Sequence, residues 1–224
     1  MALIARLIAV VVTTLVALAG VLALAGPAHA EPGFKFWAYY HLTNGKWVTS
    51  DKGADSVTPE DGDVEGFRYA TTTATEFDRP PRAVPTFEDI CADTEAAQGQ
   101  KRIGLVIDYG TPQDAAAGDT PPPAEAACAA VPADATAQQA LESVKPLRIE
   151  GGLMCAIDGY PSSECAPEVK NANVPATEEP VDLTLPGEAD QQSAESSVPW
   201  PLVGVGALVL VLGGGAVVLA RRRA

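Results

Sequence analysis

The sequence predicts an α+β fold, in which a small, mostly antiparallel sheet carries two packed helices. Three observations support this prediction. Residues 34–41 alternate between two faces and are followed by Asn44-Gly45, the strongest short signal for a β-hairpin. Continuous apolar runs, such as residues 102–107, have the length of buried strands. Two short segments combine a helical pattern with start and stop signals.

Each element follows from a local pattern. The expected strands are 34–41, 46–49, 66–73, 102–107, 147–149 and 153–157. The first helix is expected to start after the N-cap Thr86, with Asp89 completing the cap, and to run to about residue 97. The second helix covers 135–144, and segment 110–127 is expected to be a surface loop. We expect both helices on one face of the sheet, with an open α/β sandwich as the alternative.

The two ends of the chain have the composition of export and anchoring segments. Residues 1–30 contain Arg6, an apolar run and Ala28-His29-Ala30, which is the layout of a cleaved signal peptide. An uncleaved membrane helix is the alternative. Residues 198–220 carry no charge, and roughly 20 apolar residues suffice to span a bilayer as a helix. The basic tail, 221–224, should stay in the cytoplasm. We therefore expect a single-pass protein of the cell membrane with its N-terminal domain extracytoplasmic.

Between these ends we expect an extracytoplasmic domain, 31–167, and a disordered acidic stalk, 168–197. The stalk is rich in Pro, Glu, Asp, Ser, Ala and Gln and lacks the aromatic residues needed for a core. Residues 31–197 hold all 29 acidic residues but only 11 of the 15 basic ones, so their formal charge is −18. This charge argues against nucleic-acid and anionic-lipid partners, and it favours solubility and cationic partners.

All four cysteines lie in the expected extracytoplasmic domain. They are Cys91, Cys128, Cys155 and Cys165. An even number in an oxidising compartment indicates two disulfides. Of the three pairings, Cys91–Cys128 with Cys155–Cys165 is favoured because each bond closes a local loop. No metal or other cofactor is expected, since the chain has no C-x-x-C and one histidine after the signal peptide.

The extracytoplasmic domain contains, in order, the strings FKFWAYYH, NGKW, DGDVEGFRY, CADTEAAQGQKRIGLVIDYGT, PPP and GGLMCAIDGYP. This succession resembles a family of actinobacterial exported, membrane-anchored proteins over nearly the whole domain. The family has no assigned activity, so the resemblance implies no catalytic residues. Its genes tend to lie beside components of energy-coupling-factor type vitamin or metal transporters. The resemblance therefore implies a role in capturing or presenting a nutrient outside the cell.

One face of the first strand carries the first set of candidate ligand-binding residues. Trp37, Tyr39 and His41 alternate along it and form a platform on which a flat ligand or a sugar could stack. Core packing is the alternative for the two aromatic residues. His41 is either a metal or corrinoid ligand or, as is more common for a lone histidine, a structural residue.

The second candidate set lies in two similar strings, GLVIDYG and GLMCAIDGYP. It comprises Asp108, Tyr109, Asp158 and Tyr160. Two carboxylates at strand ends are what a glycosidase requires, but no other hydrolase motif accompanies them. Aspartate and glycine are also the residues that form turns. We therefore interpret the strings as core strands that end in capped turns, whose shared rim suits recognition.

The string Asp61-Gly62-Asp63-Val64-Glu65-Gly66 begins like an EF-hand calcium loop. The twelfth position is Thr72 instead of the required glutamate, and no helical pattern flanks the loop. An acidic turn that enters the strand at Phe67 is the better interpretation.

These features favour a non-enzymatic, membrane-tethered extracytoplasmic binding or interaction module, accessory to vitamin or metal uptake. Its expected partners are transporter subunits or a small-molecule ligand. A carboxylate-dependent hydrolase of cell-wall glycan, using Asp108 and Asp158, is the alternative from another class. A structural envelope protein that spaces its partners on the stalk is the third.

Overall fold

The main sheet of the computed structural model, which describes residues 31–187, has six strands. They are β1 (Glu31–Thr43), β2 (Lys46–Thr49), β3 (Val64–Thr73), β4 (Gln100–Asp108), β5 (Glu125–Pro132) and β8 (Glu168–Ala172). Their order is β2-β1-β3-β4-β5, and β8 pairs with β1. Only β3 and β4 run parallel. A separate antiparallel pair joins β6 (Leu147–Glu150) to β7 (Leu153–Ile157). The predicted small, mostly antiparallel sheet is confirmed.

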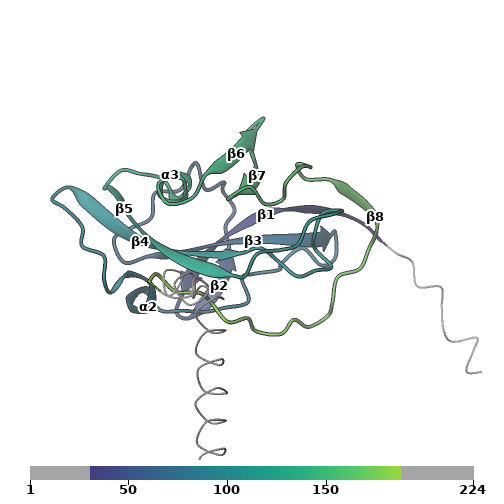
Figure 1. The fold of residues 1–224 in the computed structure, drawn as a ribbon, viewed down its shortest axis with the longest axis horizontal. Helices are drawn as coiled ribbons and strands as arrows, with labels where there is room; N and C mark the ends of the chain where they lie inside the picture. Colours follow the sequence, from purple (N-terminus) through teal and green to yellow (C-terminus); the bar gives the residue numbers. More distant parts are fainter. Residues whose placement is uncertain (1–30, 188–224) are drawn as a thin grey trace, which may run out of the picture.

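The two predicted helices are present but short. Helix α2 (Phe87–Cys91) follows a capping box made by Thr86 and Asp89. Helix α3 (Ala137–Glu142) follows an equivalent box made by Thr136 and Gln139. The first helix thus ends well before residue 97. The helices lie on opposite faces of the sheet (Figure 1), so the prediction of a common face was wrong. All ten residues of β3 are buried, so both faces of the sheet are covered at this strand. Alternation of apolar and polar residues along the strand therefore could not show which face each helix covers.

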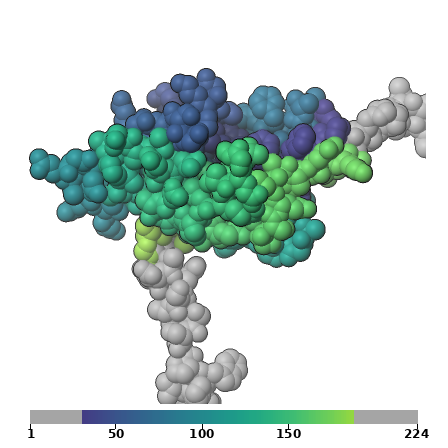
Figure 2. All heavy atoms as spheres, turned by 90° about the horizontal axis from the view of Figure 1, so that it is seen from above, coloured from purple at the N-terminus to yellow at the C-terminus, as the bar shows by residue number. Residues whose placement is uncertain are grey.

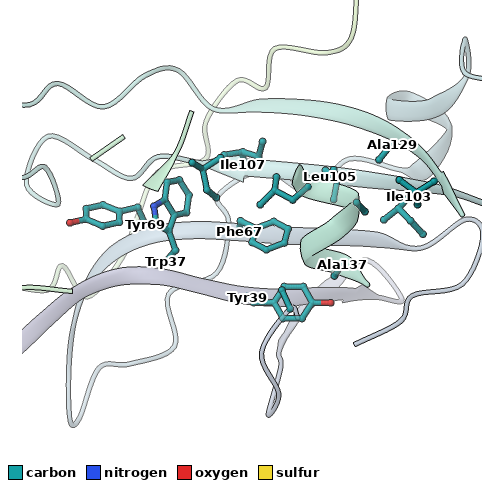
Figure 3. Packing of buried hydrophobic residues seen from close by; sticks show 14 of the residues in the cluster. Trp37, Tyr39, Phe67, Tyr69, Ile103, Leu105, Ile107, Ala129 and Ala137 are labelled. Carbon is teal, nitrogen blue, oxygen red and sulfur yellow. The ribbon is translucent and has the colours of Figure 1, made fainter. Parts of the chain in front are cut away.

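The face covered by α3, β6 and β7 holds the larger apolar core, and we call it the Trp37 face (Figure 1). Successive strand residues point to opposite faces, so Phe67 and Tyr69 of β3 project here together with Leu105 of β4. Helix α3 closes the layer with Ala137, Ala140 and Leu141. Figure 3 shows the aromatic and branched side chains gathered in one layer beside Ala137.

The opposite face is the Arg68 face, named after the buried arginine of β3. Its apolar part is small, with Val64 and Val106 packed against Ile90 of α2. The disulfide between Cys91 and Cys128 ties α2 to β5, with Cα atoms 5.2 Å apart. The second disulfide, Cys155–Cys165, joins β7 to the segment that leads into β8. Both predicted pairings are confirmed.

Two strands were missed by the sequence patterns. The first, β5, reads EAACAAVP, and alanine-rich segments have low strand propensity. The second, β8, lies in the expected stalk, and Thr184 further along makes backbone hydrogen bonds with Ala124 and Ala126 beside β5. The prediction of a disordered stalk was therefore wrong for residues 168–187. Residues 188–197 lie outside the described part of the chain.

The export and anchoring predictions also concern residues outside the described range, at 1–30, 198–220 and 221–224. Within residues 31–187, no helix is long and apolar enough to cross a membrane.

Helix α3 should contribute to stability mainly through Leu141, which is fully buried against the Trp37 face. We expect Leu141→Ala to lower the free energy of unfolding by about 2–5 kcal/mol, because it removes apolar contacts and leaves a cavity. Urea denaturation followed by circular dichroism measures this change. Glu142→Ala, the exposed neighbour, is the control and should change stability by less than about 0.5 kcal/mol. Equal effects of both substitutions would contradict this packing.

Candidate functional site

The Arg68 face contains a group of buried charges, which we call the arginine cluster. It consists of Arg68, Arg79, Arg82, Asp108, Asp114 and Glu178. Its centre follows from strand register, since Arg68 of β3 lies directly opposite Asp108 of the parallel strand β4. Both residues are 0% exposed, and Arg68 Nη1 lies 3.3 Å from Asp108 Oδ2.

The segment after β3 supplies the other two arginines of the cluster. It reads Arg79-Pro80-Pro81-Arg82, and the fixed φ of proline limits the conformations of this stretch. Arg82 donates two hydrogen bonds to the Asp108 carboxylate, one of 2.9 Å from Nε and one of 2.7 Å from Nη2. Such bidentate pairs are strong and geometrically specific. The Pro80 carbonyl accepts a hydrogen bond of 2.9 Å from Arg68.

Asp114 fastens the loop after β4 to the same cluster. Its carboxylate accepts hydrogen bonds from Arg79 and from the backbone N–H groups of Thr71 and Thr111. Burial alone raises the pKa of Asp114, but the Arg79 guanidinium and the two N–H donors outweigh it and lower the pKa to about 2. Burial likewise raises the pKa of Asp108, and its bonds to Arg82 more than reverse this effect.

The third carboxylate comes from far along the chain. After β8, residues 173–183 run along the Arg68 face, and we call them the strap (Figure 1). Glu178 of the strap accepts hydrogen bonds from both Arg68 and Arg79 through Oε1. Leu183 then packs on the apolar part of the Arg68 face, and the last described residues lie at the surface of the body (Figure 2). The strap thereby completes a cluster of three arginines and three carboxylates.

A groove follows the strap. One part, of about 430 Å³, lies between the strap and the loop after β4, and Arg82, Thr111, Gln113, Asn173 and Thr177 contribute to its lining. A neighbouring hollow of about 280 Å³ lies between the strap and residues 76–82. Both are bordered by Arg82 and Glu178. Guanidinium, hydroxyl and amide groups therefore converge on a space of small-molecule size.

Two of the predicted platform residues belong to the core of the Trp37 face. Trp37 and Tyr39 are each less than a tenth exposed. Trp37 packs against Tyr69 and Tyr109, with ring centroids 5.6 and 5.5 Å apart, and Tyr39 stacks on Phe67. This is the core packing that was the alternative interpretation.

His41 lies at the end of the same row of residues and is partly exposed. Its Nδ1 is 2.7 Å from Oε2 of Glu65, an ion-pair distance, and 3.5 Å from the Tyr39 hydroxyl. Burial raises the pKa of Glu65, because a carboxylate is poorly solvated at 2% exposure. His41 thus lies at the edge of the core beside a buried carboxylate, and its role as a ligand or as a structural residue stays a prediction.

The second candidate set is divided between the two faces of the sheet. Tyr109 and Tyr160 meet on the Trp37 face with ring centroids 5.7 Å apart. The Tyr109 hydroxyl donates to Glu125, which pairs with Lys145, and Lys145 Nζ also lies 3.3 Å from the exposed Asp158.

Asp108 points to the Arg68 face instead, so the structure does not bring the two aspartates together. Both nonetheless lie at the ends of their strands, and among the described contacts only Asp108 makes the predicted cap, since the Asp158 side chain contacts Lys145. The N–H of Gly110 donates to Asp108, and Asp158 itself has a φ of 51°.

The carboxylates of the EF-hand-like string diverge. Asp61 accepts a hydrogen bond from the backbone of Arg102, Asp63 caps the N–H of Glu60, and Glu65 pairs with His41. Residues 31–187 contain no group of three or more potential metal-ligating side chains. The string forms an acidic turn that leads into β3.

Of the residues in the arginine cluster, only Asp108 was among the candidates predicted from the sequence. A partial signal was present, since Arg68 stands between two aromatic residues that both point to the core. By alternation it had to face the other side, and it would need a carboxylate partner if that side were also covered. Nothing local indicated that β3 is central or that Glu178 would return to it.

The two aspartates should differ sharply in their effect on stability. We expect Asp108→Asn to lower the free energy of unfolding by about 3–5 kcal/mol at pH 7, because it leaves buried guanidinium charge without its partner. Asp158→Asn should change it by less than about 0.5 kcal/mol, since its side chain is half exposed and asparagine tolerates positive φ. Urea denaturation of both variants tests this, and similar losses would contradict the assignment.

Acid should weaken the cluster within a defined pH window. A carboxyl group whose folded-state pKa is lowered stabilises the fold above its ordinary pKa, 3.8 for Asp114, and this stabilisation disappears as pH falls towards about 2. We expect Asp114 to account for a loss of about 2 kcal/mol between pH 4 and pH 2. Asp114→Asn should show a correspondingly flatter pH dependence in urea denaturation. An unchanged slope would refute this role.

A family model, the SCO2322-like domain, matches residues 29–170, which is more than half of the chain. The matched segment contains all three arginines and both aspartates of the arginine cluster, but not Glu178. Searches of curated proteins and of solved structures return no match. The resemblance to an uncharacterised family is confirmed, while its source and gene neighbourhood stay predictions. The chain belongs to the family of SCO2322-like domains.

Proposed function

We propose that the chain is a non-enzymatic binding module, held outside the cell membrane by its C-terminal segment and accessory to vitamin or metal uptake. The signal-like and anchor-like ends support the location, as do the two disulfides, which persist in oxidising compartments. The formal charge of −18 over residues 31–197 supports a soluble body that avoids anionic surfaces.

The observation that carries this proposal is the groove beside the strap. Its volume of about 430 Å³ falls within the usual range for small-molecule sites, roughly 300–1,000 Å³. Its lining includes Gln113 from the loop after β4, Asn173 from the strap, and Arg82 of the arginine cluster. These groups rest on the ion-paired cluster, which is what a preorganised binding site requires.

The hydrolase alternative has less support from the same geometry. Both oxygens of Asp108 accept hydrogen bonds from Arg82, and its pKa is lowered, so it is poorly suited to act as a proton donor. Asp158 is linked to the other face of the sheet through Lys145. A glycosidase needs its two carboxyl groups on either side of one bond.

Blocking the groove tests the proposal. We expect membranes that contain the full-length protein to yield, on affinity purification and mass spectrometry, a bound small molecule together with transporter subunits. Gln113→Trp should lower the amount of recovered small molecule at least tenfold. The indole would fill the groove, while the arginine cluster beside it would stay intact. Corrinoids and metal complexes are included in the search.

The matched control is Gln98→Trp, the same substitution at an exposed residue. Gln98 lies just before the first residue of β4, whereas Gln113 follows the last one. It should recover the small molecule as the unchanged protein does. Equal loss in both variants, or recovery of neither ligand nor transporter subunits from the unchanged protein, would contradict the proposed function.

A further inference from the structure

We infer that Arg68 and Arg79 form a binding seat for the carboxylate group of a small ligand, and that Glu178 of the strap occupies this seat as an internal substitute. The inference deepens the proposed binding function, on which its biological meaning rests, by naming the chemical class of the ligand.

The geometry of the seat is that of oxyanion recognition. Arg68 Nη2 donates to Glu178 Oε1 over 2.7 Å, and Arg79 Nη2 donates to the same oxygen. Two guanidinium groups from different segments thus converge on one carboxylate oxygen, while Oε2 has no partner in the described chain. Hydrogen bonds from guanidinium groups to a carboxylate are charge-assisted and therefore strong.

The charge of the seat requires an anion. Without Glu178, three arginines face only Asp108 and Asp114, which leaves one positive charge in a region where Arg68 is 0% and Arg79 is 4% exposed. The remaining carboxylate contact of Arg68 Nη2 would be Asp114 Oδ2, at 3.7 Å. An uncompensated buried charge is strongly unfavourable, so the seat needs an anion, and here Glu178 supplies it.

The donors of the seat also exceed the acceptors around it. The Nε atoms of Arg68 and Arg79 are buried, and neither has a hydrogen-bond partner within residues 31–187. The domain therefore offers more donor groups at this place than its own side chains satisfy, as expected of a site that receives acceptor atoms from a ligand.

Glu178 belongs to a segment that is weakly attached elsewhere. Between the end of β8 and Thr184, the hydrogen bonds and ion pairs that join residues 173–183 to the rest of the described chain all pass through Glu178. Most residues of the strap are exposed. Glu178 can therefore leave the seat without breaking a strand pairing. Glu178 borders both hollows of the groove, and Arg79 of the seat borders the one of about 280 Å³.

The segment matched by the family model supports a distinction between the two arginines of the seat and Glu178, which occupies it. It contains both arginines of the seat but ends at residue 170, before the strap. Because the strap is part of the same chain, it competes with a free carboxylate at a high effective concentration. Removal of the Glu178 side chain should therefore uncover a site that the unchanged protein largely conceals.

Chemical rescue tests the inference with acetate as the probe. We expect Glu178→Ala in the full-length, detergent-solubilised protein to lower Tm by about 5 °C or more, since the buried charge loses its partner. Sodium acetate should then raise Tm saturably by about 3 °C or more relative to sodium chloride at equal ionic strength. The unchanged protein should respond equally to the two salts over this concentration range.

Glu179→Ala is the matched control, because Glu179 is the exposed neighbour and makes no hydrogen bond or ion pair within the described chain. It should keep the original Tm and show no preference for acetate. If Glu178→Ala does not fold in chloride, its refolding yield in acetate against chloride provides the same readout. Equal effects of acetate and chloride on Glu178→Ala would overturn the inference, without affecting the Gln113→Trp test, which leaves Glu178 in place.

Discussion

The buried guanidinium of Arg68 is the constraint on which one whole side of the domain depends. A full charge at the centre of a sheet is tolerated only when carboxylates neutralise it and acceptors fill its donor positions. Asp108 meets part of this need through strand register alone. The remainder draws in the proline-rich segment after β3, the loop after β4 and the strap. These irregular stretches have defined positions because each supplies a hydrogen-bond acceptor or a carboxylate to the buried Arg68 guanidinium.

The two faces of the sheet are therefore stabilised by different physics. Aromatic and branched side chains on the Trp37 face exclude water and interlock without needing charge. The Arg68 face combines a small apolar patch with ion pairs, and a disulfide secures its short helix. Hydrophobic packing tolerates modest changes of shape, whereas a buried ion network depends on every member. This difference concentrates specificity, and with it the candidate binding groove, on the Arg68 face.

Local chemistry explains which features could be predicted from the sequence. The Asn44-Gly45 hairpin, the Thr86 capping box and the short disulfide loops depend on residues close in the chain, and all are present. The face occupied by each helix, the strands β5 and β8 and the course of the strap depend on distant pairing. For the same reason the candidate residues Trp37 and Tyr39 looked like a surface platform, although their neighbours bury them. Glu178 had no local signature beyond an acidic composition, which also describes a disordered chain.

The attachment of the strap at its two ends has a mechanical consequence. One end continues from β8, which pairs along β1, and the other is held beside β5 by the two hydrogen bonds of Thr184. Tension applied to the chain at Gly187 would load the contacts of Leu185 and Thr184 first and Glu178 next, and it would reach the β8 ladder last. The domain would therefore yield in steps from its C-terminal side, and its arginine seat would open before β8 separates from β1.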